Sequence, residues 1–314
     1  MADPPPARLP LANGGSMPVV GYGLYQMDEE EAERSTAVAL SCGYRHLDSA
    51  SFYGNEAGVG RAIAASSIPR EELFIASKVW TDCIGLGAHA VRHSVEVSLE
   101  RLQVDFLDLV YVHWPVPGKH VEAYKALEAL VAEGKARGIG LSNYRVADYE
   151  ELVASGITLA PLVNQIEVNP FLYRRDAIDF FQDKGMAIVG YKPLLRGKAV
   201  TDATAIEVAR KHNVTPAQVL LRWGIQHKFA VLPKSSQAER IDSNLHLFHF
   251  HLDDGDMATL DSLTTKDSLA NFEAHFTKRS VADPSCPTLG DYAPVPGGGG
   301  GAEEAAVAAA QSGR

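Results

Sequence analysis

The sequence predicts an α/β protein, a (β/α)8 TIM barrel that carries an N-terminal β-hairpin and a disordered C-terminal tail. Short apolar runs alternate along the 314 residues with longer stretches of helical period. The apolar runs have no polar face, as expected of parallel strands that helices cover. Roughly eight such strand–helix units fill about 250 residues, which is the usual size of this barrel. A doubly wound open sheet is a competing layout that periodicity alone leaves open.

The expected elements follow one another in a regular order. The stretch "RLPLANGGSMPVV" joins two short apolar runs through a glycine-rich turn and predicts a hairpin. Strands are then predicted at residues 19–23, 44–48, 73–78, 107–113, 137–142, 161–167, 186–192 and 230–233. Helices are predicted between them at residues 29–41, 88–102, 121–133, 176–184 and 203–212, and from residue 238 onward. In the second of these helices, Val95, Leu99 and Leu102 share one face, opposite the charged residues.

The sequence changes character near its C-terminal end. The stretch "PVPGGGGGAEEAAVAAAQSGR" has five consecutive glycines and then an alanine-rich run, with too little apolar bulk to pack. We therefore expect one barrel domain over residues 1–284 and a low-complexity, disordered tail over residues 285–314.

Charge and cysteine content limit the partners. The formal net charge is −10 and no basic run interrupts it, so neither nucleic acid nor an anionic membrane is an expected partner. Cys42, Cys83 and Cys286 are odd in number and widely separated, which suits a reducing compartment and predicts neither a disulfide framework nor a metal site. Neither a signal peptide nor a membrane span is evident. We expect a cytoplasmic monomer.

Four polar residues lie where predicted strands end. Asp48 ends the strand at 44–48 and Tyr53 follows in its loop, within the stretch "GYRHLDSASFYGNE". Lys78 ends the next strand, and His113 ends the one after it. The C-terminal ends of barrel strands carry catalytic groups. Singly, the four residues have ordinary explanations: a turn-forming acid, a lysine that reaches solvent, a core histidine and an uninformative tyrosine.

Together at one end of a barrel, the four side chains suit proton transfer. We expect Asp48 to neutralise Lys78, and Lys78 to lower the pKa of the Tyr53 phenol from its usual value of about 10. A tyrosine acid beside a neutral histidine can polarise a carbonyl oxygen. The missing component is an external source of hydride.

A basic segment predicts where a phosphorylated cofactor binds. No G-x-G-x-x-G motif follows a predicted strand, so a Rossmann site is not supported. In "VLPKSSQAERIDSN", however, Lys234, Ser235 and Arg240 surround a strand end and a helix start, where a phosphate dianion is well accommodated. Solvated charges on an outer helix are the alternative interpretation.

Three segments carry a resemblance to a known family. The stretches "GYRHLDSASFYGNEAGVG", "RGIGLSNY" and "LPKSSQAERIDSNLHL" resemble the signature segments of the aldo-keto reductase superfamily, in family order. The likeness runs from about residue 9 to about residue 263. Only the short stretch "PVPGKHVEAY" lies between the fourth strand and its helix. With this short loop, the chain resembles the diketogluconate reductase and prostaglandin F synthase-like aldehyde reductases.

The resemblance implies a barrel that binds NADPH, or NADP+ in the reverse direction, in an extended form. It implies a catalytic tetrad of Asp48, Tyr53, Lys78 and His113, in which Tyr53 is the general acid and His113 orients the carbonyl. The cofactor contacts that it implies are Asp48, Ser142, Asn143, Gln165, Tyr191, Lys192, Pro193, Leu194, Arg196, Lys234, Ser235, Arg240 and Asn244. The implied substrate pocket comprises Tyr25, Tyr53, Trp80, His113 and Trp114.

Two positions depart from the family pattern. Ser243 stands where a glutamate is common beside the adenine, and Lys192 replaces a small hydroxyl residue near the pyrophosphate. Lys192 and Arg196 are therefore either additional cationic contacts to the cofactor or charges that point to solvent.

The expected function is NADPH-dependent reduction of small-molecule carbonyl compounds. Aldehydes are the main substrates expected, with ketones and keto sugars as further candidates. The alternative is a slow-turnover NADPH-sensing or structural barrel protein, which measured turnover would distinguish. A barrel hydrolase or isomerase would need a paired carboxylate or metal site that the sequence does not offer.

Overall fold

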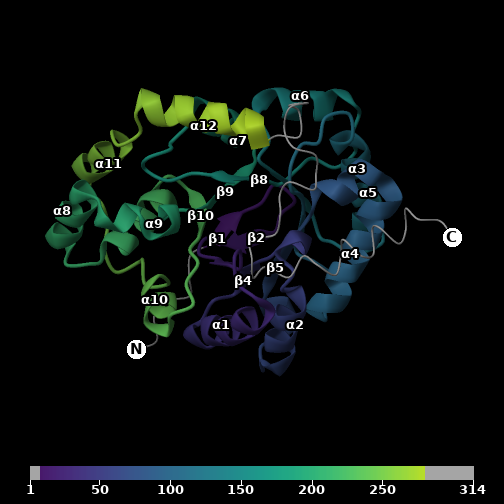
Figure 1. Cartoon of the computed structure of the whole chain (residues 1–314), viewed down its shortest axis with the longest axis horizontal. Coiled ribbons are helices and arrows are strands. Elements are labelled where there is room, and N and C mark those ends of the chain that lie inside the picture. Colours follow the sequence, from purple (N-terminus) through teal and green to yellow (C-terminus); the bar gives the residue numbers. More distant parts are fainter. Residues whose placement is uncertain (1–7, 280–314) are drawn as a thin grey trace.

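The computed structural model describes residues 8–279 of the chain. The tail predicted at residues 285–314 lies outside the described residues, as does the predicted domain boundary. Within the described part, ten strands and a surrounding set of helices form the barrel and its hairpin (Figure 1).

Eight parallel strands of the described chain form one sheet in the order β10-β9-β8-β7-β6-β5-β4-β3. A parallel bridge between Val20 and Val231 brings the last strand beside the segment that leads into β3, so the sheet is nearly closed. The open-sheet alternative is therefore wrong. The strands are β3 (Tyr22–Gly23), β4 (His46–Asp48), β5 (Phe74–Val79), β6 (Leu109–Val112), β7 (Ile139–Ser142), β8 (Val163–Glu167), β9 (Ala187–Tyr191) and β10 (Phe229–Leu232).

The helices surround the sheet, as Figure 1 shows, and the predicted ones are confirmed to within one residue at each end. They are α1 (Glu29–Cys42), α2 (Glu56–Ala65), α3 (Thr81–Leu86), α4 (Ala88–Leu102), α5 (His120–Ala132), α6 (Val146–Ala154), α7 (Arg175–Asp183), α8 (Ala203–His212), α9 (Pro216–Gln226), α10 (Ala238–Ser243), α11 (Asp254–Asp261) and α12 (Lys266–Arg279). Short 3-10 turns lie at η1 (Ser51–Tyr53), η2 (Arg70–Glu72), η3 (Leu195–Gly197) and η4 (Ala199–Thr201).

Capping residues explain where helices begin and end. Asp28 accepts a hydrogen bond from the backbone of Glu31 at 2.7 Å and starts α1, and Gly43 ends it in the left-handed region at φ 109°. Thr215 and Gln218 form a reciprocal capping box at the start of α9, a signal that would have predicted this helix.

The predicted hairpin is present and closes one end of the barrel. Strands β1 (Arg8–Pro10) and β2 (Ser16–Pro18) pair antiparallel. Leu11 and Met17 are buried in a cluster with residues that begin strands β5, β6 and β8, namely Phe74, Leu109 and Val163. The hairpin therefore covers the N-terminal ends of the strands, which leaves the C-terminal ends for a site.

No helix in residues 8–279 is long and apolar enough to cross a bilayer. Within the same residues, no cluster of three or more histidine, cysteine or acidic side chains could hold a metal ion.

Candidate active site

The ends of three neighbouring strands bring the predicted tetrad together. In β5, Phe74, Ala76 and Lys78 alternate toward the barrel interior, and Ala76 pairs with Asp48, the last residue of β4. His113 directly follows β6, the next strand in the sheet. Parallel register thus places these side chains at the same end of the barrel.

Lys78 is the central cation of the cluster. Its Nζ donates to Asp48 Oδ1 at 2.5 Å, to the backbone oxygen of Ser49 at 2.7 Å and to Tyr53 Oη at 3.4 Å. The side chains of Lys78 and Asp48 are 0% and 4% exposed. Burial lowers the pKa of Lys78, whereas the Asp48 carboxylate opposes that change.

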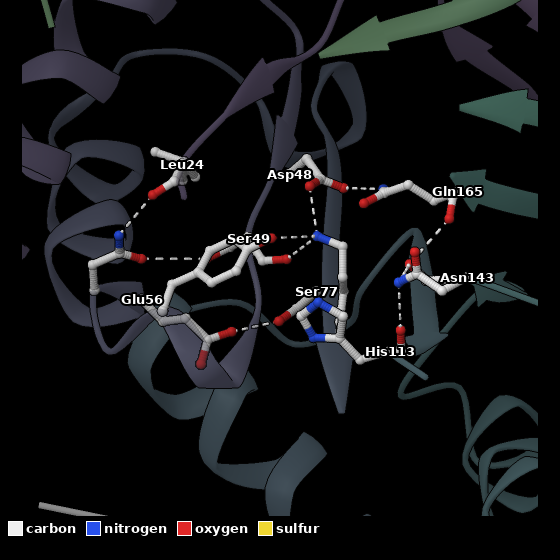
Figure 2. Close-up of polar contacts among 12 residues, drawn as sticks. Leu24, Asp48, Ser49, Glu56, Ser77, His113, Asn143 and Gln165 are labelled. Atoms are coloured by element: carbon white, nitrogen blue, oxygen red, sulfur yellow. Dashed lines mark hydrogen bonds and ion pairs between the residues drawn. The ribbon is translucent and has the colours of Figure 1, made fainter. Parts of the chain in front are cut away.

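Asp48 is held from two sides. Its second oxygen, Oδ2, accepts a hydrogen bond from Gln165 Nε2 at 2.7 Å (Figure 2). Both carboxylate oxygens therefore have donors, and the buried charge is matched by the ammonium of Lys78. This arrangement fixes the lysine and leaves its third donor directed at the phenol.

The expectation that the pKa of Tyr53 falls below its usual value is wrong for this structure, because burial and the charge of Asp48 outweigh the opposing effect of Lys78. Burial raises the pKa of the Tyr53 phenol well above 10, and the negative charge of Asp48 raises it further. The lysine lies nearer to Asp48 than to the phenol, so its charge is already matched. The phenol consequently keeps its proton near neutral pH, which is the form a general acid needs.

His113 lies beside Tyr53 as a neutral imidazole. The two ring centroids are 6.1 Å apart, and burial together with the charge of Lys78 holds the pKa of His113 well below 6.5. The backbone oxygen of His113 accepts from Asn143 Nδ2 at 3.0 Å. No residue of the described chain bonds to His113 Nδ1.

The buried histidines make the protein less stable in acid. His113 and the buried His46 both have lowered pKa values in the fold, so below about pH 6.5 the unfolded chain binds protons that the folded chain does not. We therefore expect the free energy of unfolding to fall as the pH drops below about 6.5. His113→Gln should make this fall shallower when urea unfolding is compared at about pH 7.5 and about pH 5.5. The exposed His89→Gln is the matched control, and equal slopes for all three proteins would contradict the prediction.

The polar residues predicted to hold a nicotinamide form one hydrogen-bonded group. Ser142 Oγ donates to the backbone oxygen of Gln165 at 3.1 Å, and Tyr191 Oη donates to Asn143 Oδ1 at 2.7 Å. Asn143 has a left-handed backbone at φ 61°, which turns its amide toward the site. These side chains come from the ends of β7, β8 and β9 and continue the ring that the tetrad begins.

One cavity of about 990 Å³ joins the predicted residues. All of the predicted catalytic, cofactor and substrate residues line it except Lys78, which lies behind Asp48 and Tyr53. The predicted lining residues are Tyr25, Asp48, Tyr53, Trp80, His113, Trp114, Ser142, Asn143, Gln165, Tyr191, Lys192, Pro193, Leu194, Arg196, Lys234, Ser235, Arg240 and Asn244.

The far end of the cavity is cationic. Lys234 and Arg240 are exposed, and neither makes an ion pair with a carboxylate in residues 8–279. Lys192 differs, because its Nζ bonds to Glu167 Oε2 at 2.7 Å and is not directed freely to solvent. Amides and a phenol at one end and unmatched cations at the other fit a phosphorylated nicotinamide dinucleotide.

Sequence reasoning missed two residues near the tetrad. Phe52 stacks on Trp80 with ring centroids 3.9 Å apart and lines the cavity. Its position next to Tyr53 in the sequence could have predicted this role. Glu56 is buried on the outer side of β5, where Ser77 and Ser98 donate to its two oxygens at 2.5 and 3.0 Å. Figure 2 shows Glu56 and Ser77 directed toward each other. Nothing in the sequence distinguishes this acid from an exposed first-turn glutamate.

The fold and the site together define an oxidoreductase built on a parallel barrel. The profile of the Aldo/keto reductase family matches residues 10–265, and the chain belongs to this family. The predicted resemblance is thereby confirmed at the level of the family.

Relatives and solved structures agree with that assignment. The chain is 40% identical to the glyoxal reductase of Bacillus subtilis (strain 168) over 81% of this chain and 91% of that protein. It is 41% identical to an aldo-keto reductase of Mycolicibacterium smegmatis (strain ATCC 700084 / mc(2)155) over 82% and 94%. The crystal structure of an aldo/keto reductase from Brucella melitensis matches with a TM-score of 0.80 and 35% identity, over 84% of this chain and 99% of that one. The aldose reductase from Schistosoma japonicum matches with a TM-score of 0.78 and 33% identity, over 83% and 93%.

Proposed function

We propose that this protein is an NADPH-dependent reductase that converts aldehydes to alcohols, with Tyr53 as the proton donor. The observation that carries the proposal is the cluster in which a protonated Tyr53 phenol lies 3.4 Å from Lys78 Nζ and faces a neutral His113. Ketones and keto sugars are further candidate substrates. The location in the cytoplasm and the monomeric state stay predictions.

Each residue of the site has a separate role in the proposed reaction. The nicotinamide, when bound, supplies a hydride to the carbonyl carbon. Tyr53 Oη gives its proton to the carbonyl oxygen, and Lys78 stabilises the phenolate that remains. The neutral imidazole of His113 orients the oxygen by a hydrogen bond, while Asn143 and Gln165 hold the carboxamide of the ring. The alcohol therefore receives one hydride and one proton.

The substrate end of the cavity favours small, uncharged aldehydes. Tyr25, Phe52, Trp80 and Trp114 supply aromatic walls around the tetrad. Such walls bind apolar or compact carbonyl compounds without selecting for a charged group. The relative named glyoxal reductase supports dicarbonyl aldehydes as members of the substrate class.

A substrate panel tests the proposal. The consumption of NADPH is followed with glyoxal, methylglyoxal, an aromatic aldehyde, a ketone and a keto sugar. We expect turnover with the aldehydes above the rate without substrate. Tight binding of NADPH with negligible turnover across the panel would instead support the sensing or structural alternative. Failure to bind NADPH at all would overturn the proposal.

The cationic end is expected to select the phosphorylated cofactor. Lys234→Ala and Arg240→Ala should each raise the Kd of NADPH by about 10- to 100-fold, because each removes a hydrogen bond to a doubly charged phosphate. The Kd of NADH, which lacks that phosphate, should change by less than about threefold, a margin of well under 1 kcal/mol.

Calorimetric titration of both cofactors measures these constants. The matched control is Lys184→Ala, an exposed lysine at the end of α7 that does not line the cavity. Equal losses of affinity for NADPH and NADH would show that the two cations do not bind the distinguishing phosphate.

A further inference from the structure

An ion pair lies at the ends of strands β8 and β9, in the wall of the cavity. Lys192 follows the last residue of β9, and Glu167 is the last residue of the neighbouring strand β8. Their side chains meet at 2.7 Å between Lys192 Nζ and Glu167 Oε2 and are 22% and 13% exposed. Lys192 lines the cavity, whereas Glu167 lies behind it.

The backbone holds Lys192 in an unfavourable conformation. Lys192 has φ 51°, and Leu195 and Arg196 have φ 47° and 56°, all in the left-handed region that side chains with a Cβ rarely adopt. Asn169 Nδ2 donates to the backbone oxygen of Lys192 at 3.3 Å and helps to fix this turn. Strained residues of this kind persist at sites where the surrounding structure determines their position.

The ammonium of Lys192 has unused donors. An ammonium has three N–H groups, and Glu167 takes one of them. No other hydrogen-bond acceptor for Lys192 Nζ is present in residues 8–279. Arg174 also lies within electrostatic range of Glu167, but its guanidinium stacks on Phe272 at 4.2 Å and does not line the cavity.

The position of the pair identifies the group that it would meet. Gln165 lies in β8, Lys234 follows β10, and Lys192 follows β9, which lies between these two strands in the sheet; all three residues line the cavity. A dinucleotide that places its nicotinamide beside Gln165 and its 2′-phosphate beside Lys234 would therefore run its pyrophosphate past the end of β9, where Lys192 lies immediately after Tyr191.

We propose that Glu167 sets the affinity for the cofactor by neutralising Lys192, the cation that faces the pyrophosphate. Glu167 acts as a positioning residue that touches no cofactor atom. Its carboxylate holds the ammonium in place and offsets its charge, so the pyrophosphate is held less tightly than by a free lysine. This inference rests on the proposed NADPH-dependent function.

The test is a double-mutant cycle that removes each charge of the pair, alone and together. Calorimetric titration measures the Kd of NADPH for each variant. Glu167→Gln should lower the Kd about five- to tenfold, because the lysine keeps an uncharged neighbour and its full charge acts on the phosphates. Lys192→Met should raise the Kd by a similar factor. In the double variant, the Kd should return to within about threefold of that of the unmodified protein, because the two positions together again carry no net charge.

Two fragments of the cofactor locate the effect. The binding of 2′,5′-ADP, which retains one phosphate of the pyrophosphate, should tighten in Glu167→Gln. The binding of 2′-AMP, which lacks that phosphate, should not change. Circular dichroism and thermal unfolding establish that each variant is folded, and Lys192→Met gives an independent measurement if Glu167→Gln does not fold.

The outcomes separate this inference from the proposed function. If the unmodified protein does not bind NADPH, the proposed function fails together with the inference. If NADPH binds but Glu167→Gln weakens it or leaves it unchanged, the inference alone is overturned. Equal effects on 2′,5′-ADP and 2′-AMP would also overturn it, because the charge would then act away from the pyrophosphate.

Discussion

Tyr53→Phe is expected to lower kcat by about 10²- to 10⁴-fold while leaving the Kd of NADPH within about twofold. The substitution removes the phenolic oxygen and its proton but keeps the ring, whose centroid lies 5.0 Å from that of Tyr25. The neighbouring His113 does not replace the phenol as the acid, because it is a neutral imidazole whose pKa is well below 6.5. Initial rates with glyoxal and calorimetric titration of NADPH measure the two quantities.

The matched control for this variant is Tyr25→Phe. Tyr25 lines the same cavity, and we expect its loss of a hydroxyl to change KM more than kcat. If Tyr53→Phe retained more than about a tenth of the activity, a general acid would have to be sought elsewhere. If it lost NADPH binding as well, the phenol would have a structural role that its position does not suggest.

Lys78→Met should destabilise the fold by about 3–5 kcal/mol and also abolish turnover. The change leaves the Asp48 carboxylate buried without its cation, with a side chain that is 4% exposed. The backbone oxygen of Ser49 loses a donor at the same time. Urea unfolding monitored by circular dichroism gives the free energy, and NADPH consumption gives the activity.

A second variant separates the two effects of Lys78. The double substitution Asp48→Asn with Lys78→Met removes both charges, so it should regain at least half of the lost stability without regaining activity. A double variant as unstable as Lys78→Met would mean that packing, and not the unpaired charge, accounts for the loss.

The apolar strands and their polar ends were predictable because each signal is local. Lys78 is the last residue but one of β5, six buried residues from Phe74 to Val79, and a lysine there stands out against its apolar neighbours. The same holds for Asp48, which ends β4, and for His113, which directly follows β6. Helices α3, α6, α9, α11 and α12 were not predicted; α3 has six residues and α11 has eight, too few turns to show a clear helical period.

The features that depend on distances between side chains far apart along the chain could not be predicted from the sequence. Whether the pKa of Tyr53 ends above or below its usual value depends on the burial of the phenol and on the separations of Lys78 Nζ from Asp48, 2.5 Å, and from the phenol, 3.4 Å, which no spacing along the chain defines. The pairing of Lys192 with Glu167 likewise follows from strand register between β8 and β9. The functional roles assigned by resemblance stay predictions until the variants are measured.

The bridge between Val20 and Val231 has a consequence for how the chain acquires its structure. The two residues lie near opposite ends of the described chain, so barrel closure depends on the longest-range contact in the sheet. During synthesis, β3 has no partner on its outer edge until β10 has left the ribosome. An unpaired edge of this kind can pair with other chains. The nascent protein is therefore most prone to aggregate before its last strand emerges.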